Sequence, residues 1–357
     1  MKNFKLLFLI LIACASANFL FAAENSQIQS QQTTNSQSQI ANSQRQSENS
    51  QTQVKNQQSQ QVKSENQKNQ QKSAEFYTLP EATRKSVGIS GLNKSSTKKF
   101  RELYMSDSKQ IWLSEVLYDS IPYRPYIVQQ LKRRKMPLCL QFLPIVESNY
   151  KVKATSPSGA KGLWQFMENS MSPYMQKNWW YDERLDPWKE TDAALSKLTE
   201  NYKTFGDWAF ALAAYNMGAG AIKKIQKQYP GKDYWWLSEN GKLRKETADY
   251  VPKLLAISDL IMNAEYWGLL RIAASDKRIE NVAPETFSYI KITGSVSFET
   301  ISKATGISVS TLEFLNPALL HNATPSKSTW RLRLPKGSAK KAAEDLRTYL
   351  KEQKAND

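Results

Sequence analysis

Residues 136–147 have the sequence MPLCLQFLPIVE, an almost wholly apolar run that ends in a glutamate. An apolar run of this length, punctuated by proline, predicts a buried helix. The carboxyl group of Glu147 would leave that helix partly desolvated, which disfavours its ionised form and raises its pKa. A carboxyl group that is still protonated near neutral pH is what cleavage of a glycosidic bond requires as general acid. From position alone, an acid that only caps the helix end is the competing interpretation.

Three further segments place polar side chains beside glycines. Residues 159–167 (GAKGLWQFM) form a glycine-bracketed loop in which Gln165 would hydrogen-bond an amide. An apolar helix over residues 209–214 runs into residues 215–220 (YNMGAG), and residues 246–252 (ETADYVP) open another helix. Each segment taken alone is equally consistent with simple helix punctuation.

In this order and spacing, the four segments resemble the motifs of the soluble-lytic-transglycosylase-type domain of glycoside hydrolase family 23. The resemblance covers residues 105–270 and predicts a catalytic domain over residues 105–275. It implies a mainly α chain whose catalytic domain has a lysozyme-like α+β fold. It also implies that Glu147 is the catalytic residue. The substrate-binding residues that it implies are Ser148, Gln165, Met167, Tyr215, Asn216 and Tyr250.

The resemblance also implies a reaction in which one carboxyl group serves twice. Glu147 would protonate the oxygen between MurNAc and GlcNAc, and would then act as base on the C6 hydroxyl of the same MurNAc, with Tyr250 close by. That hydroxyl attacks C1 and closes a 1,6-anhydro ring, so no second carboxylate is needed. The implied partners are the glycan strands of peptidoglycan, and the implied chemistry uses no cofactor and no metal.

Two alternatives remain open at this point. If Asp182, Glu183 or Asp186 faced Glu147 across the cleft, the pair of carboxylates would make a hydrolytic muramidase. A non-catalytic scaffold that binds peptidoglycan would keep the fold without the reaction, although the intact motifs argue against it.

A small separate unit is predicted over residues 285–336. Residues 287–292 and 330–334 alternate as strands, and two short helices over residues 298–305 and 309–315 lie between them. This order resembles the lysin motif, which binds polymers of N-acetylglucosamine. Because residues 294–298 (GSVSF) replace the expected Gly-Asp-Thr-Leu turn, glycan binding and a purely structural role both remain open.

The remainder of the C-terminal part is less informative. Residues 337–357 form a charged tail that would extend a helix or fray. His321 lies in the long loop of the lysin-motif-like unit, has no evident partner in the sequence and is expected at the surface.

The first residues predict export. Residues 1–23 combine a short positive region with an apolar run and are expected to be a signal peptide. Cleavage after Ala23, lipidation of Cys14 and a retained transmembrane anchor are the three alternatives, and all place the rest of the chain outside the cytoplasm. We therefore expect a periplasmic protein, either free or held to the membrane through Cys14. Residues 24–75 are rich in Gln, Ser and Asn and predict a disordered linker.

Composition excludes several other classes of protein. The chain has 357 residues, one histidine and two cysteines, so zinc sites built from histidines, Ser-His-Asp triads and a disulfide framework are not expected. Its net charge is +16, but the basic residues are spread out and form no dense arginine block. That distribution favours loose attraction to an anionic polymer or a membrane face over nucleic-acid recognition. We expect a monomer.

Overall fold

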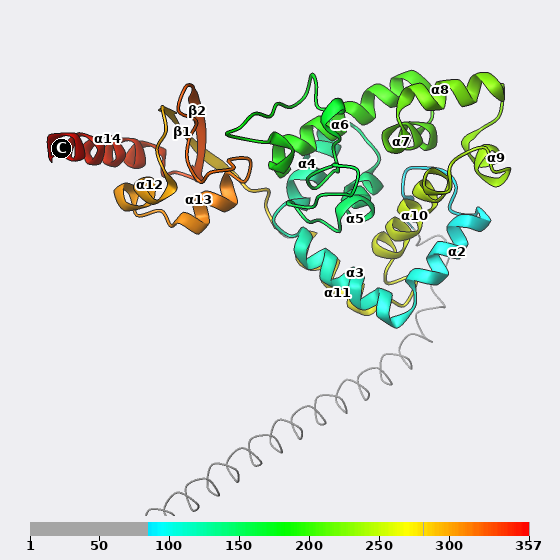
Figure 1. The fold of residues 1–357 in the computed structure, drawn as a ribbon. Coiled ribbons are helices and arrows are strands. Elements are labelled where there is room, and N and C mark those ends of the chain that lie inside the picture. Colours follow the sequence, from blue (N-terminus) through cyan, green and yellow to red (C-terminus); the bar gives the residue numbers. More distant parts are fainter. Residues whose placement is uncertain (1–84, 281, 357) are drawn as a thin grey trace, which may run out of the picture. The chain divides into compact units, whose positions relative to one another are not determined.

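The computed structural model describes residues 85–280 and 282–356 (Figure 1). The predicted signal peptide, the lipid acceptor Cys14 and the polar linker lie outside the described residues. Within the described part of the chain, no helix has both the length and the apolar character needed to cross a membrane.

The first part of the described chain is built from helices, which confirms the mainly α prediction. Its elements are α2 (Ser95–Tyr104), α3 (Asp107–Ser120), α4 (Arg124–Arg133), η2 (Leu138–Phe142), α5 (Leu143–Ser148), η3 (Glu168–Ser170), η4 (Glu183–Leu185), α6 (Pro187–Phe205), α7 (Trp208–Met217), α8 (Ala219–Gln228), α9 (Tyr234–Glu239), α10 (Lys245–Met262) and α11 (Leu270–Glu280). Its hydrophobic core begins at Val87 and Ile89, upstream of the expected domain start at residue 105.

Local signals fix the two helices that support the site. The side chain of Asp186 accepts hydrogen bonds from the first backbone N–H groups of α6, and Pro187 occupies the first helical position. Gly206 ends α6 in the left-handed conformation (φ 69°), and Asp207 then caps α7. Helix α7 is buried along residues 209–214 and packs against α6 and α10, so it forms the centre of the helical unit.

Residues 136–147 do not form the single buried helix that the sequence predicts. They divide into the 3₁₀ helix η2 and the short helix α5. Pro144 explains the break: it has no N–H to donate, and the first turn of a helix, where it lies in α5, is the place where a missing N–H costs least. Asn149 then ends α5 in the left-handed region (φ 54°), so Glu147 sits in the last turn of a very short helix.

The C-terminal unit has the predicted order of strand, helix, helix and strand. Its elements are β1 (Phe287–Thr293), α12 (Phe298–Thr305), α13 (Val309–Leu315), β2 (Thr329–Pro335) and α14 (Ala339–Asn356). The strands pair antiparallel, with Ile290 opposite Leu332. The charged tail continues as α14, and Ala342 and Leu346 of α14 are buried in the same small core. The tail therefore belongs to this unit and does not fray along its length.

The lysin-motif-like unit packs against the start of α6. Arg333 of β2 forms an ion pair with Asp186, the residue that caps α6, and both side chains are largely buried. The ring of Trp188 lies edge-on to Phe287 and Phe314, at centroid distances of 4.7 Å and 5.9 Å. These contacts support a structural role for this unit.

The loop that contains His321 contributes to the same contact. His321 is exposed, as predicted, but it has partners: its Nε2 lies 2.9 Å from the carbonyl oxygen of Trp179, and its ring packs on Trp179 and Trp180. No sequence pattern indicates these partners, because they come from residues far away along the chain.

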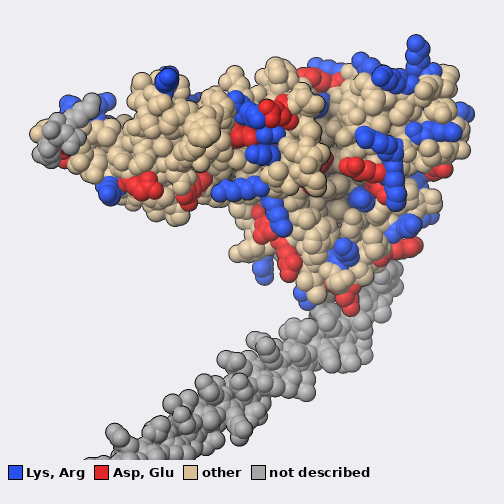
Figure 2. Space-filling view, viewed as in Figure 1, with Lys and Arg blue, Asp and Glu red and all other residues tan. Residues whose placement is uncertain are grey.

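Charges on the surface are mixed. On the face drawn in Figure 2, lysine and arginine side chains of the described residues are interspersed with aspartate and glutamate. This distribution agrees with the spread of basic residues along the sequence.

Candidate active site

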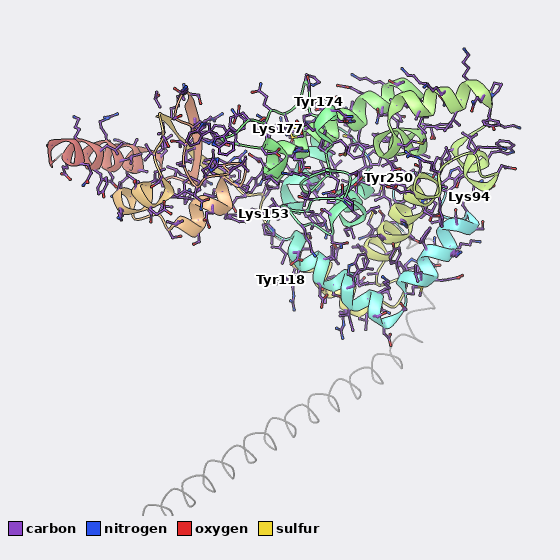
Figure 3. The ribbon with its side chains drawn as sticks, in the orientation of Figure 1. Lys94, Tyr118, Lys153, Tyr174, Lys177 and Tyr250 are labelled. Atoms are coloured by element: carbon purple, nitrogen blue, oxygen red, sulfur yellow. The ribbon has the colours of Figure 1, made fainter. Side chains whose placement is uncertain are left out.

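Glu147 of α5 lies against Tyr250 of α10, the tyrosine labelled in Figure 3. The Tyr250 hydroxyl donates a hydrogen bond to Oε1 of Glu147. Burial raises the pKa of Glu147 to about 7; the hydrogen bond from Tyr250 opposes this rise, and the negative charge of Glu246 adds to it. Burial also keeps the pKa of Tyr250 well above its ordinary value, so Tyr250 remains a donor. Glu147 can therefore both carry and release a proton near neutral pH.

The loop that follows is held by a buried carboxylate on α6. Glu190 is fully buried and accepts hydrogen bonds from the backbone N–H of Leu163 (2.7 Å) and of Trp164 (3.0 Å). Gly162 has φ 87°, and a Cβ at this position would lie 1.9 Å from the carbonyl oxygen of Arg184. Only glycine fits there, and the loop is drawn tightly onto α6.

Ser148 also holds this loop. Its hydroxyl donates to the carbonyl oxygen of Leu163 (2.8 Å), and the side chain is buried. Ser148 is therefore placed beneath the loop and does not line the cavity beside Glu147. The resemblance implies that Ser148 binds substrate, but the structure places its side chain away from the cavity. Its hydroxyl instead joins α5 to the loop.

Gln165 lies at the turn of the loop. Its backbone is in the left-handed region (φ 53°), and its Nε2 donates to the carbonyl oxygen of Gly162 at 2.9 Å. This conformation presents the side chain to the cavity that contains Glu147. The amide can therefore meet a polar group of a ligand there.

Tyr215 and Asn216 reach the site from the end of α7. The Tyr215 hydroxyl donates to the carbonyl oxygen of Trp164 at 2.9 Å, which ties α7 to the loop. Nδ2 of Asn216 donates to Oε1 of Glu246 (3.1 Å), and Oδ1 of Asn216 accepts from the Thr247 hydroxyl (2.7 Å). Hydrogen bonds thus hold both the nitrogen and the oxygen of the Asn216 amide, and the neutral Nδ2 group of Asn216 orients the carboxylate of Glu246.

These side chains surround one cavity of about 370 Å³. It is lined by Val146, Glu147, Ser156, Ser158, Ala160, Gln165, Phe166, Met167, Ser170, Lys197, Tyr215, Asn216, Glu246, Tyr250 and Lys253. All predicted site residues except Ser148 are among them.

Sequence reasoning missed several residues of this cavity. Glu246 opens the fourth motif, so its position was visible in the sequence although its role was not. Ser156 and Ser158 lie just before the glycine-bracketed loop and carry only a weak signal. Lys253 directly follows residues 246–252 of the fourth motif, but its place in the cavity was not predicted, and Lys197 had no sequence signal because it lies within a long helix among other charged residues.

The three carboxylates proposed as partners of Glu147 lie elsewhere. Asp182 is paired with Arg184 (2.7 Å), Glu183 is paired with Lys189, and Asp186 caps α6. None of the three lines the cavity. The alternative in which one of these three faces Glu147 across the cleft therefore does not hold, and Glu246 is the second carboxylate of this cavity.

A family comparison agrees with this geometry. Residues 125–237, which contain Glu147, the loop and Asn216, match the family model described as the transglycosylase SLT domain. The chain carries an SLT domain. Residues 286–350 match a second model, described as the LysM-like domain of the lytic transglycosylase MltD. The predicted family resemblance is confirmed for both units.

Curated proteins that are similar to this chain include the two that follow. The chain is 32% identical over 241 residues to membrane-bound lytic murein transglycosylase D of Escherichia coli K12, across 66% of this chain and 51% of that protein. Residues 143–148 (LPIVES) and 250–254 (YVPKL) predict this relative from the sequence. A protein of Alteromonas sp. M-1 described as a putative tributyltin chloride resistance protein is 38% identical over 104 residues, which are 28% of this chain and 50% of that protein. The chain spans about half the length of these curated relatives.

The chain is also similar to a solved structure. The 70 kDa soluble lytic transglycosylase of Escherichia coli aligns with a TM-score of 0.35 and 24% identity, over 49% of this chain and 31% of that one.

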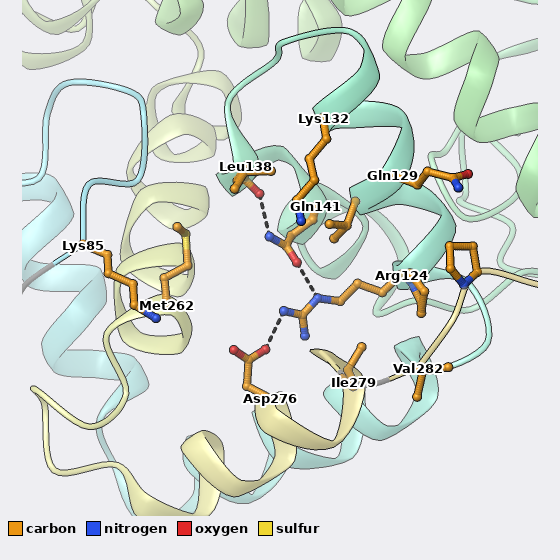
Figure 4. A pocket seen from close by; sticks show the side chains of 13 residues that line it. Lys85, Arg124, Gln129, Lys132, Leu138, Gln141, Met262, Asp276, Ile279 and Val282 are labelled. Atoms are coloured by element: carbon orange, nitrogen blue, oxygen red, sulfur yellow. Dashed lines mark hydrogen bonds and ion pairs between the residues drawn. The ribbon is translucent and has the colours of Figure 1, made fainter.

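A second cavity of about 540 Å³ lies on another side of the helical unit, between α4, α10 and α11 (Figure 4). Arg124 lies in its wall, where it donates to Gln141 (2.6 Å) and forms an ion pair with Asp276 (2.5 Å). Neither Glu147 nor any other predicted site residue of the SLT domain lines this cavity. In the described ranges, no group of three or more histidine, cysteine, aspartate or glutamate side chains has an arrangement that could hold a metal ion.

Proposed function

We propose that this chain is a lytic transglycosylase that cleaves the β-1,4 bond between MurNAc and GlcNAc in peptidoglycan and leaves 1,6-anhydroMurNAc ends. The observation that carries the proposal is Glu147, a half-buried carboxyl group with a pKa of about 7 in a cavity that the SLT motifs surround. The name of the Escherichia coli relative supports the same reaction.

The first step needs a proton donor beside the glycosidic oxygen. Glu147 holds its proton at neutral pH because burial disfavours its charged form. As the bond to the leaving GlcNAc breaks, Glu147 transfers this proton to the glycosidic oxygen and becomes a carboxylate. The Tyr250 hydroxyl then stabilises the new negative charge on Oε1.

The second step returns the proton to Glu147. The C6 hydroxyl of the same MurNAc attacks C1 while Glu147 accepts the hydroxyl proton, and the enzyme is restored without water being consumed. An intramolecular nucleophile has a very high effective concentration, which favours ring closure over hydrolysis. Gln165 and Asn216 would orient the 2-acetamido group that stabilises positive charge at C1, and Tyr215 would fix the loop that covers the sugar.

A hydrolytic muramidase is the second candidate, because Glu246 lines the same cavity as Glu147. Glu246 would have to act as nucleophile or activate water. Its Oε1 already accepts a hydrogen bond from Asn216, which favours a role in orienting that amide.

The proposal extends to the setting of the reaction. We place the enzyme in glycoside hydrolase family 23, with carbon–oxygen lyase chemistry, and in the periplasm, where cell-wall remodelling takes place. Attachment to the membrane through a lipid on Cys14 and a monomeric state belong to the same proposal. The LysM-like unit would dock on the SLT domain through Arg333 and Asp186, with binding of glycan as an additional role.

Purified wild-type protein and the Glu147→Gln variant should be incubated with isolated sacculi. Wild type should release soluble fragments, and Glu147→Gln should lose more than about 1,000-fold of the rate, since acid and base roles fall on one residue. Glu115→Gln, an exposed glutamate on α3, is the matched control and should keep full activity. If Glu147→Gln kept more than a tenth of the wild-type rate, Glu147 would not be the catalytic acid.

A further inference from the structure

Lys197 is a cation in the wall of the catalytic cavity that the proposed chemistry does not use. It projects from α6, and its Nζ lies 5.5 Å from the ring centroid of Phe166 and 6.0 Å from that of Tyr215. Phe166 follows Gln165 in the loop, and Tyr215 ties α7 to the same loop. The ammonium group is therefore held over two aromatic rings of the site itself.

No acidic side chain neutralises this cation in the part of the chain that the structure describes. None of the ion pairs found among the described residues includes Lys197. The acid whose charge acts on it is Glu200, which accepts a hydrogen bond from the Tyr174 hydroxyl. Partial burial lowers the pKa of Lys197, which reflects the cost of holding a cation there without a carboxylate partner.

The two acids of the cavity come from other elements. Glu147 lies on α5 and is hydrogen-bonded to Tyr250, while Glu246 lies on α10 and is hydrogen-bonded to Asn216. The two side chains of the cavity that Lys197 contacts, Phe166 and Tyr215, are neutral. A half-buried lysine that lines a cavity and forms no ion pair among the described residues is suited to receive an anion from a ligand.

We propose that Lys197 binds a carboxylate of the substrate and thereby makes the cavity selective for acidic glycans over neutral ones. This inference rests on the proposed function. MurNAc differs from GlcNAc by a lactyl ether that ends in a carboxyl group. In bare strands this group is a free carboxylate, whereas in peptide-bearing strands it is an amide and the stem peptide supplies other carboxylates. Chitin oligosaccharides have the same backbone linkage and no carboxylate.

The test measures binding in the Glu147→Gln background, where cleavage does not interfere. Lys197→Met keeps the apolar stem over Phe166 and removes the charge. Lys203→Met removes the same charge from the exposed end of α6, outside the cavity, and is the matched control. The three probes are a bare GlcNAc-MurNAc oligosaccharide, its peptide-bearing form and chitohexaose, each titrated by calorimetry.

Lys197→Met should weaken binding of an acidic probe about tenfold, the value of one charge-assisted hydrogen bond, and should leave chitohexaose binding unchanged. Loss on the bare oligosaccharide alone assigns the lactyl carboxylate, loss on the peptide-bearing form alone assigns the stem peptide, and loss on both means that either carboxylate is accepted. Lys203→Met should bind all three probes as the parent does. Lys197→Arg, which keeps the charge, should bind the acidic probes more tightly than Lys197→Met does.

Equal affinity of Lys197→Met and the parent for both acidic probes would overturn the inference, as would an equal loss on chitohexaose. Failure of the proposed function is distinguishable from this result. In that case the protein with Glu147 and Lys197 both in place would release no 1,6-anhydro fragments from sacculi, whatever the affinities of Lys197→Met for the probes.

Discussion

Replacing Glu190 tests how the catalytic loop is held. Glu190 lies on α6, is fully buried and accepts the backbone N–H groups of Leu163 and Trp164. Glu190→Ala removes both acceptors and leaves two buried donors without partners. Glu190→Gln keeps one oxygen and turns an amide N–H toward the second donor, so it removes one hydrogen bond.

The size of the effect follows from these contacts. An unsatisfied buried donor costs about 1–3 kcal/mol, so Glu190→Ala should lower the free energy of unfolding by about 2–6 kcal/mol and Glu190→Gln by about half as much. The loop carries Gln165 and Met167 into the cavity, and a shift of about 1 Å in a positioning element costs on the order of 100-fold in rate. Glu190→Ala should therefore lose activity at temperatures where it is still folded.

Two assays check this prediction. Urea unfolding gives the free energy of unfolding, and turnover of sacculi at low temperature gives the rate, with Glu115→Gln as an exposed control. If Glu190→Ala unfolded within about 0.5 kcal/mol of wild type, the loop would not depend on this carboxylate, and the reasoning would be refuted.

Four further predictions address the acid and the contact between the two units. Because Glu147 is active in its protonated form and has a pKa of about 7, kcat/KM should fall about tenfold per pH unit above that value; a flat profile to pH 9 would contradict this. Tyr250→Phe removes the hydrogen bond that lowers the pKa of Glu147, so the fall of kcat/KM on the alkaline side of the pH profile should move to higher pH. Glu246→Gln removes the charge that raises this pKa, so the same fall should move to lower pH while anhydro products persist; complete inactivity would indicate a second catalytic carboxylate. Arg333→Met leaves Asp186 without its ion-pair partner and should destabilise the folded protein by about 3 kcal/mol in urea unfolding, with no change in the linkage that is cleaved.

The site residues that the sequence predicts are those that local sequence patterns mark. Glu147, Gln165 and Asn216 each lie beside glycines or at the end of an apolar run, and the structure brings these three residues together in one cavity. The two strands and two short helices of the C-terminal unit are also predicted from alternation and from Gly306.

The remaining features depend on contacts between distant residues. Glu190 and Lys197 lie in the same charged helix, α6. Only the packing of α6 against the loop buries Glu190 beneath the backbone of Leu163 and places Lys197 in the lining of the cavity. His321 meets Trp179 across 142 positions of sequence. The break within residues 136–147 has a local cause, because Pro144 lies in the first turn of α5. The continuous apolar pattern of these residues nevertheless predicts one helix.

The measurement closest to the central claim is the mass of the products released from sacculi by the wild-type enzyme. If the C6 hydroxyl attacks C1, each new MurNAc end is a 1,6-anhydro sugar, lighter by one water than a hydrolysed end and inert to borohydride. We expect every fragment to carry this end. Fragments that all carry reducing ends, and that take up label from borohydride, would show that water attacks C1 and would contradict the single-carboxylate mechanism assigned to Glu147.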